Sequence, residues 1–82
     1  MKLRVLGFGI VKDIFGASFR DIEVGEGLSI SVAGFKDALE SQYPEIKRLA
    51  SYAIAVNNEY AADNEIIGEK DEVAVIPPVS GG

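Results

Sequence analysis

The sequence has 82 residues, 48% of them hydrophobic and 26% charged, with a net charge of −5 and neither cysteine nor histidine. This length and apolar content predict one small domain with a packed aliphatic core, and they exclude a disordered chain. The acidic balance argues against nucleic acid as a partner, and the missing thiols and imidazoles remove the usual nucleophiles, zinc ligands and neutral-pH proton carriers, so we expect neither a bound metal nor self-contained catalysis.

The chain opens with a partly alternating apolar segment, residues 2–10, which predicts a first strand covered on both faces. Charges interrupt this run, which is unlike a signal peptide, and no segment reaches the ~20 apolar residues of a membrane span. We therefore expect a cytoplasmic protein with no membrane partner. Gly7 and Gly9 leave gaps in one face of the strand. There we favour a bulge or a closely packed neighbouring backbone over a partner contact.

A hairpin and a helix should follow. Residues 11–18 are expected to turn the chain, and residues 19–24 to form a second strand paired with the first. Either Ser29 or Ser31 can then cap a helix, which Pro44 should end. One further short turn is expected over residues 45–50. The apolar residues of the helix recur at helical spacing and are Val32, Phe35, Ala38, Leu39 and Tyr43.

The second half of the chain predicts shorter elements. Residues 53–56 read as a short strand, Asn57-Asn58 as a tight turn, and residues 72–76 as a final strand inside the sheet. The order fits an α+β fold of the β-grasp type, a mixed sheet with one main helix packed across it. A ferredoxin-like fold would need a second full helix, for which residues 61–67 are too short and broken.

The last six residues predict a flexible tail, 77–82, attached to a β-grasp domain over residues 1–76. Pro77 and Pro78 favour extended backbone and should end the final strand. Gly81 and Gly82 have no β-carbon, so this backbone can enter a channel too narrow for side chains. Six extended residues reach roughly 20 Å. We expect the Gly82 carboxylate to be the reactive group, presented to the active site of a partner.

The run Asp71-Glu72-Val73-Ala74-Val75-Ile76-Pro77-Pro78-Val79-Ser80-Gly81-Gly82 resembles the C-terminal signature of the small, sulfur-carrying subunit of molybdopterin synthase, a ubiquitin-like family. The similarity extends over nearly the whole chain. It includes Val5-Leu6-Gly7-Phe8 near the start and Ala55-Val56-Asn57 with Tyr60 in the middle. Lys70 departs from the pattern, since the family commonly has glycine before the Asp-Glu pair.

The resemblance implies a chemistry that needs no reactive side chain. An activating, adenylating enzyme would use ATP to convert the Gly82 carboxylate into an acyl-adenylate, and a sulfur donor would then give a thiocarboxylate. The large subunit of the synthase would accept the tail and transfer its sulfur to cyclic pyranopterin monophosphate. The chain would then be a non-catalytic sulfur-donor subunit with no permanently bound cofactor, and Gly81 would serve to keep the tail slender.

The resemblance also implies a partner-binding surface. Phe8, Tyr60 and Ile76 match family positions that contact both partners, although the ordinary alternative for each is the sheet core. Pro77, Pro78, Val79 and Ser80 are expected to enter the partner together with the glycines. Lys12 is the best candidate for a salt bridge with a partner. We interpret Asp71-Glu72 as a solvated turn rather than a metal site, because adjacent strand residues point to opposite faces.

Three other functions stay open at this point. The sulfur could go to thiamine, a thiolated tRNA or a tungsten cofactor instead of molybdopterin. The chain could also be a ubiquitin-like modifier, in which a lysine amine attacks the activated Gly82. A passive interaction module is the third possibility, and it predicts that loss of Gly81-Gly82 changes nothing.

Overall fold

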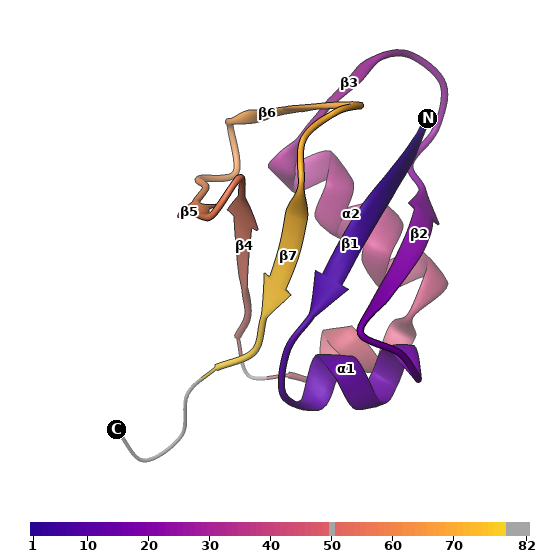
Figure 1. Cartoon of the computed structure of the whole chain (residues 1–82), viewed down its shortest axis with the longest axis vertical. Helices are drawn as coiled ribbons and strands as arrows, with labels where there is room; N and C mark the ends of the chain where they lie inside the picture. Colours follow the sequence, from indigo (N-terminus) through magenta and orange to yellow (C-terminus); the bar gives the residue numbers. More distant parts are fainter. Residues whose placement is uncertain (50, 79–82) are drawn as a thin grey trace.

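Figure 1 shows a twisted sheet with one long helix lying across it, in a computed structural model that describes residues 1–49 and 51–78. The elements in chain order are β1 (Lys2–Gly7), α1 (Ile10–Phe15), β2 (Phe19–Glu23), β3 (Ser29–Ser31), α2 (Val32–Gln42), the 3-10 helix η1 (Pro44–Arg48), β4 (Ala53–Val56), β5 (Glu59–Tyr60), β6 (Ile66–Gly68) and β7 (Val73–Ile76). No helix in this described part of the chain is long and apolar enough to cross a membrane.

The main sheet has five strands in the order β2-β1-β7-β4-β5. β1 runs antiparallel to β2 and parallel to β7, while β4 is antiparallel to both β7 and β5. β7 therefore lies at the centre of the sheet, as predicted for the final strand, and its Val73 and Val75 are fully buried. The predicted α+β class and β-grasp arrangement are confirmed.

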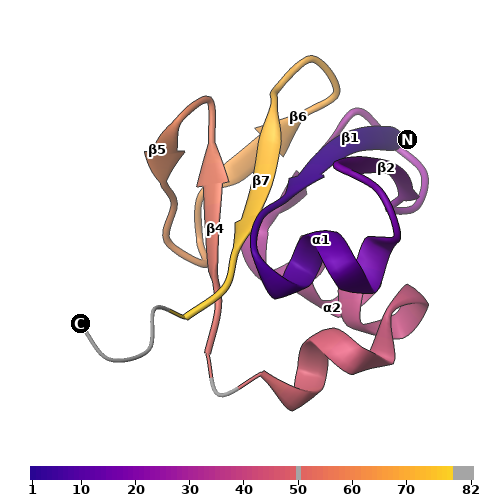
Figure 2. The same ribbon diagram turned by 60° about the horizontal axis from the view of Figure 1, so that its bottom comes forward.

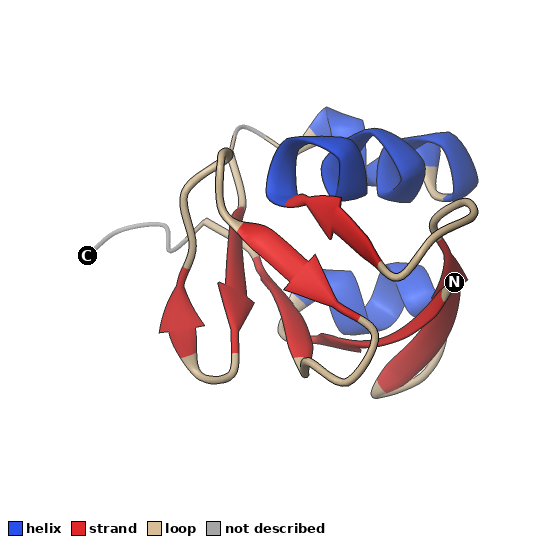
Figure 3. Cartoon of the chain, turned by 90° about the horizontal axis from the view of Figure 1, so that it is seen from above, coloured by secondary structure: helices blue, strands red, loops and turns tan. Residues whose placement is uncertain are grey.

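α2 covers one face of this sheet (Figure 3). Ser31, not Ser29, is its N-cap, and the Ser31 hydroxyl accepts a hydrogen bond from the Gly34 amide at 3.0 Å. The helix ends at Gln42, before Pro44, which begins η1. The core between helix and sheet is aliphatic apart from two phenylalanines and consists of Leu3, Val5, Val11, Phe15, Ile22, Val24, Val32, Phe35, Leu39, Ile46, Ile54, Ile67, Val73 and Val75.

The prediction for the first strand and its following loop is wrong in two respects. β1 stops at Gly7 and only alternate residues are buried, so just one of its faces is covered. Residues 10–15 then form a helix, α1, instead of part of a strand and a turn. Val11 and Phe15, one helical turn apart, are both buried. The helix ends at Gly16, whose left-handed backbone places its amide near the Lys12 and Asp13 carbonyls.

α1 also explains the gap at Gly7. A β-carbon on this glycine would lie 2.9 Å from Phe15 Cδ2, 3.0 Å from Val11 Cγ1 and 3.2 Å from the Lys12 amide nitrogen. The closely packed neighbour predicted for this position is confirmed, and it is α1. Figure 2 shows this helix at the end of the sheet toward which β7 runs.

Two short strands were not predicted as such. Asn57 and Asn58 form the expected tight turn, with φ of 52° and 70°, but the turn leads into β5. The short apolar segment at residues 66–67 belongs to β6, which pairs antiparallel with β3 to form a separate two-stranded sheet. The central pair of this small sheet is Ile30 with Ile67.

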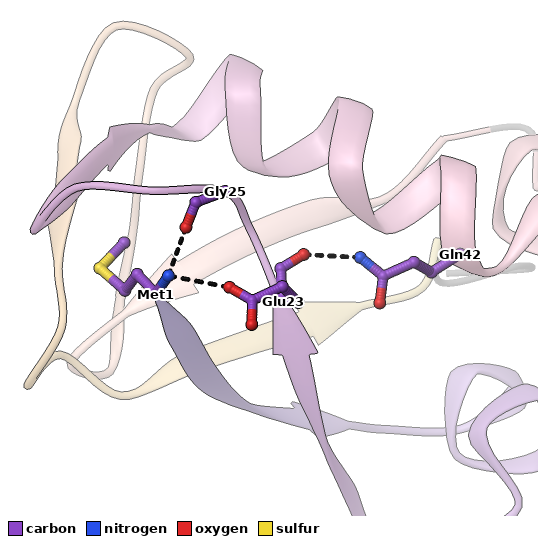
Figure 4. Close-up of polar contacts among 4 residues, drawn as sticks. All are labelled: Met1, Glu23, Gly25 and Gln42. Atoms are coloured by element: carbon purple, nitrogen blue, oxygen red, sulfur yellow. Dashed lines mark hydrogen bonds and ion pairs between the residues drawn. The ribbon is translucent and has the colours of Figure 1, made fainter.

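Polar contacts tie the start of β1 to the end of α2 (Figure 4). The Met1 ammonium donates to the Glu23 carboxylate at 2.8 Å and to the Gly25 carbonyl. Gln42 Nε2 donates to the Glu23 carbonyl at 2.7 Å. The hydrogen bond from the ammonium holds the pKa of the Glu23 carboxyl below its usual value.

Candidate functional site

An apolar row crosses all five strands on the face of the main sheet that α2 leaves open. The strand register aligns Phe19 of β2 with Leu6 of β1, Leu6 with Ala74 of β7, Ala74 with Ala55 of β4, and Ala55 with Tyr60 of β5. Successive residues of a strand point to opposite faces, so this row lies opposite the core residues. It supplies an apolar strip across this face, in which Ala55 is itself buried, with 6% of its surface exposed.

The strip forms the floor of a groove to which the sequence-predicted residues contribute. Phe8, Tyr60 and Ile76 all line one shallow groove of about 250 Å³. Phe8 is 51% exposed and Tyr60 73% exposed, while Ile76 is half-buried. Phe8 and Tyr60 therefore lie at the surface and not in the sheet core, and the structure brings all three together. Their role as a partner-binding surface stays a prediction.

Sequence reasoning missed the rest of the groove lining, which consists of Leu6, Ala55, Asn58, Glu72 and Ala74. Leu6 lies between the buried Val5 and Gly7, and Ala74 lies between the buried Val73 and Val75. That alternation shows that they face away from the core, but only the strand register shows that they lie side by side. The groove is thus an apolar floor with a polar side at Asn58 and Glu72.

The other half of the open face is charged. Lys2 pairs with Glu23 and Arg4 with Asp21 across β1 and β2. Arg4 Nε lies 3.8 Å from Asp21 Oδ1, and its guanidinium lies 4.4 Å from the centre of the Phe19 ring. Arg4 and Asp21 therefore lie next to the apolar strip on the charged side, and the apolar half of the face is the half toward which β7 runs.

A second hollow of about 370 Å³ lies next to the groove. Leu6 and Phe8 line both hollows, so the Phe8 side chain stands at the boundary between them. Lys12 and Ser18 contribute polar groups to the second hollow. Its position beside Phe8 is consistent with a salt bridge from Lys12 to a partner, which stays a prediction.

Hydrogen bonds between two turns support the edge of the groove. Asp71 Oδ2 accepts from the Gly68 amide at 2.7 Å, and Asp71 Oδ1 accepts from Asn57 Nδ2 at 3.0 Å. Asn57 Oδ1 in turn accepts from the Glu72 amide at 3.0 Å. These bonds, that from Gly68 first, hold the pKa of the Asp71 carboxyl below its usual value. They fix the β4–β5 turn, and with it Tyr60, against the start of β7.

The tail begins beside the groove. Ile76 ends β7, Pro77 is half-buried, and Pro78 is exposed. A β-carbon on Gly9 would lie 3.1 Å from Pro77 Cγ, so the proline ring packs against the turn between β1 and α1. The predicted site residues Val79, Ser80, Gly81 and Gly82 lie outside the described residues.

A sequence model of the ThiS family matches residues 5–82. The chain belongs to the ThiS family. It is 36% identical over 86 residues to the molybdopterin synthase sulfur carrier subunit of Dictyostelium discoideum, covering 99% of this chain and 96% of that relative. It is 34% identical over 84 residues to the same subunit of Mycobacterium tuberculosis, covering 100% and 99%. The resemblance to sulfur carrier subunits of molybdopterin synthase is confirmed.

Solved structures of similar proteins agree with this family assignment. A putative molybdopterin converting factor, subunit 1, from Pyrococcus furiosus superposes with a TM-score of 0.81 at 26% identity, covering 96% of this chain and 99% of that one. SAMP1 from Haloferax volcanii superposes with a TM-score of 0.79 at 25% identity, and both chains are covered completely. This ThiS-family chain therefore has the ubiquitin-like β-grasp fold.

Proposed function

We propose that this chain is the sulfur carrier subunit of a molybdopterin synthase and acts in the cytoplasm. The observation that supports this most strongly is the full-length similarity to sulfur carrier subunits, at 34% and 36% identity. The family match also runs through Gly82. The similarity to a protein of this name therefore extends over the whole chain, positions 81 and 82 included.

The proposed chemistry takes place at the Gly82 carboxylate. A carboxylate oxygen attacks the α-phosphate of ATP on the activating enzyme, pyrophosphate leaves, and an acyl-adenylate forms. The adenylate is a good leaving group, so a sulfur donor can displace AMP and leave a thiocarboxylate. The thiocarboxylate sulfur then attacks cyclic pyranopterin monophosphate on the large subunit, and water cleaves the resulting thioester, which returns the Gly82 carboxylate and leaves the sulfur on the pterin. Each step uses side chains of the partners, which agrees with the absence of cysteine and histidine from this chain.

The folded body would hold the partner while the tail reacts. The groove lined by Phe8, Tyr60 and Ile76 lies beside Pro77, where the tail begins. Such exposed aromatic and aliphatic side chains are typical of interface cores. The net charge of −5 favours a partner with basic residues around its contact surface. One face of the sheet would in this way serve the activating enzyme and the large subunit in turn.

A reconstitution tests this proposal. The chain is first incubated with the activating enzyme, ATP and a sulfur donor, and the product is then given to the large subunit with cyclic pyranopterin monophosphate. We expect molybdopterin from the full chain and none from a chain that lacks Gly81 and Gly82. Equal product from both chains would contradict the proposal and favour a passive interaction module. Sulfur loaded on Gly82 without conversion of this precursor would point to another sulfur pathway.

A protein modifier is the second candidate function. SAMP1, a small archaeal modifier protein, matches the fold over the complete length of both chains. In that role a lysine amine of another protein would attack activated Gly82, and AMP would leave as an isopeptide bond forms. Peptides whose lysine carries residues 71–82, the remnant left by tryptic cleavage after Lys70, would support the modifier when recovered from cells that express the tagged chain. If such peptides are absent while sulfur transfer is intact, the sulfur carrier is the only one of the two functions that remains.

A further inference from the structure

We propose that Gly9 is a positioning residue, which gives Pro77 a fixed seat and so sets the direction in which the chain leaves the groove. This inference rests on the proposed function, because that direction matters only if Gly82 must reach the active site of a partner. Gly9 directly follows the groove residue Phe8, and Pro77 directly follows the groove residue Ile76. The seat therefore lies at the point where the groove meets the tail.

The seat arises from the parallel register of β1 and β7. Val5 pairs with Val73, and Gly7 pairs with Val75. The same offset, continued two residues further, brings Gly9 beside Pro77. A β-carbon on Gly9 would lie 3.1 Å from Pro77 Cγ, inside the roughly 3.5–4.0 Å of a relaxed carbon contact. The proline ring thus occupies space that is free because residue 9 is a glycine.

Glycine is needed at position 9 for its backbone angles as well as for the space that the Pro77 ring occupies, and the two requirements must be tested separately. Its φ of 54° and ψ of −129° turn the chain from β1 into α1, and residues with a side chain rarely adopt these angles. Gly25 has φ of 100°, but a β-carbon on it would have no atom within 4 Å. Gly25 therefore shares the backbone requirement of Gly9 without the contact to Pro77, and it provides a matched control.

The position of Pro77 constrains the direction of the residue that follows it. Two successive prolines have restricted backbone angles, so the tilt of Pro77 sets the direction of Pro78. A change in the tilt of Pro77 therefore changes the direction in which the chain leaves the groove. A misplacement of about 1 Å at a reacting group can slow a reaction about 100-fold. The seat on Gly9 thus links docking at the groove to delivery of Gly82.

The test compares Gly9→Ala with Gly25→Ala. The readouts are ATP–pyrophosphate exchange by the activating enzyme at varied carrier concentration and the midpoint of urea unfolding. Both variants should lose stability, because both place alanine at positive φ. Gly9→Ala should lower kcat about tenfold with KM nearly unchanged, since the groove still docks. Gly25→Ala should leave kcat and KM unchanged at a temperature where this variant is folded.

A third variant covers the case in which Gly9→Ala does not fold. Pro77→Ala removes the ring without straining Gly9, and it should lower kcat by a similar factor. The double variant should show no further loss if both act through one contact. In the free protein, a nuclear Overhauser effect between the Gly9 α-protons and the Pro77 ring protons reports the contact without any activity measurement.

Two outcomes overturn the inference alone: equal kcat for Gly9→Ala and Gly25→Ala while the wild-type chain is active, or no Overhauser effect between Gly9 and Pro77. A wild-type chain that supports no exchange would instead overturn the proposed function. Exchange activity of the wild-type chain therefore tests the proposed function, and the comparison of variants with the Overhauser effect tests the role of Gly9.

Discussion

Gly7 is buried beneath α1 and has no room for a β-carbon. Its φ is not in the left-handed region, so crowding by Phe15, Val11 and the Lys12 backbone is the main obstacle to a side chain. We expect Gly7→Ala to lower the free energy of unfolding by about 1–3 kcal/mol, because α1 must move away from the sheet. Urea denaturation measures this loss.

Gly68→Ala is the matched control for that substitution. A β-carbon on Gly68 would lie 3.6 Å from Asp71 Oδ2, which is an ordinary contact. We expect a change within about 0.5 kcal/mol for this variant. An equally small change for Gly7→Ala would show that α1 adapts at little cost, and would contradict close packing as the reason for glycine.

Phe8 should act in binding and not in folding. It is 51% exposed, and its ring borders the groove. We expect Phe8→Asp to raise the Kd for the large subunit about 30-fold, corresponding to roughly 2 kcal/mol, because a charge replaces an apolar contact. Titration calorimetry gives the Kd, and circular dichroism reports the fold.

Leu28→Asp serves as the control for Phe8→Asp. Leu28 is 72% exposed and lies before β3, outside the residues that line the groove. Its substitution should leave the Kd unchanged. Loss of the folded spectrum in Phe8→Asp would assign this side chain to the core, and an unchanged Kd would remove it from the interface.

At the scale of elements, the long periodic segments were predictable and the short ones were not. The β1–β2 hairpin, α2 and the inner position of β7 follow from apolar patterns that extend over several residues. α1 has only six residues, and the glycines at positions 7 and 9 directly before it indicate a turn more than a helix. Its signal was the spacing of Val11 and Phe15 followed by Gly16, which marks a buried helical turn with a left-handed cap.

Sequence periodicity does not predict which distant segments of the chain pair as strands. β3 and β6 have three residues each, and their partnership depends on how the chain is folded between them. The same limit applies to the site. Resemblance to a family pointed to Phe8, Tyr60 and Ile76, whereas Leu6, Ala55 and Ala74 join them through strand register, which no single strand encodes.

The turns that carry Asn57 and Asp71 should respond to pH. The pKa of Asp71 is lowered in the folded state by hydrogen bonds from the Gly68 amide and Asn57. This stabilisation is therefore fully present above the pKa of an unfolded aspartate, about 4, and is lost as the pH falls through the lower folded pKa. We expect the urea midpoint of the wild-type chain to fall more between pH 6 and pH 3 than that of Asp71→Asn.

Glu23, which also has a lowered pKa, contributes in the same pH range but is present in both proteins, so it cancels in this comparison. The Asp71→Asn variant should also be less stable than the wild-type chain at pH 6, because the amide is a weaker acceptor for the Gly68 amide. Parallel pH profiles for the two proteins would show that the hydrogen bonds of Asp71 do not stabilise the charged form.

At the scale of the whole molecule, folding and chemistry are assigned to different parts of the chain. The core residues of the described structure all lie between Leu3 and Val75. The apolar half of the open sheet face lies beside the start of the tail, and the proposed reacting group is at Gly82. A body of this kind can present one thin chain end to successive partners without supplying a catalytic side chain.

The most direct test of the proposed sulfur-carrier chemistry is fragment mass spectrometry of the C-terminal peptide after incubation with the activating enzyme, ATP and a sulfur donor. Fragmentation is needed because oxidation of Met1 changes the intact mass by almost the same amount as exchange of oxygen for sulfur. We expect one sulfur in place of one oxygen at Gly82. An unmodified Gly82, under conditions that load another sulfur carrier, would contradict this chemistry.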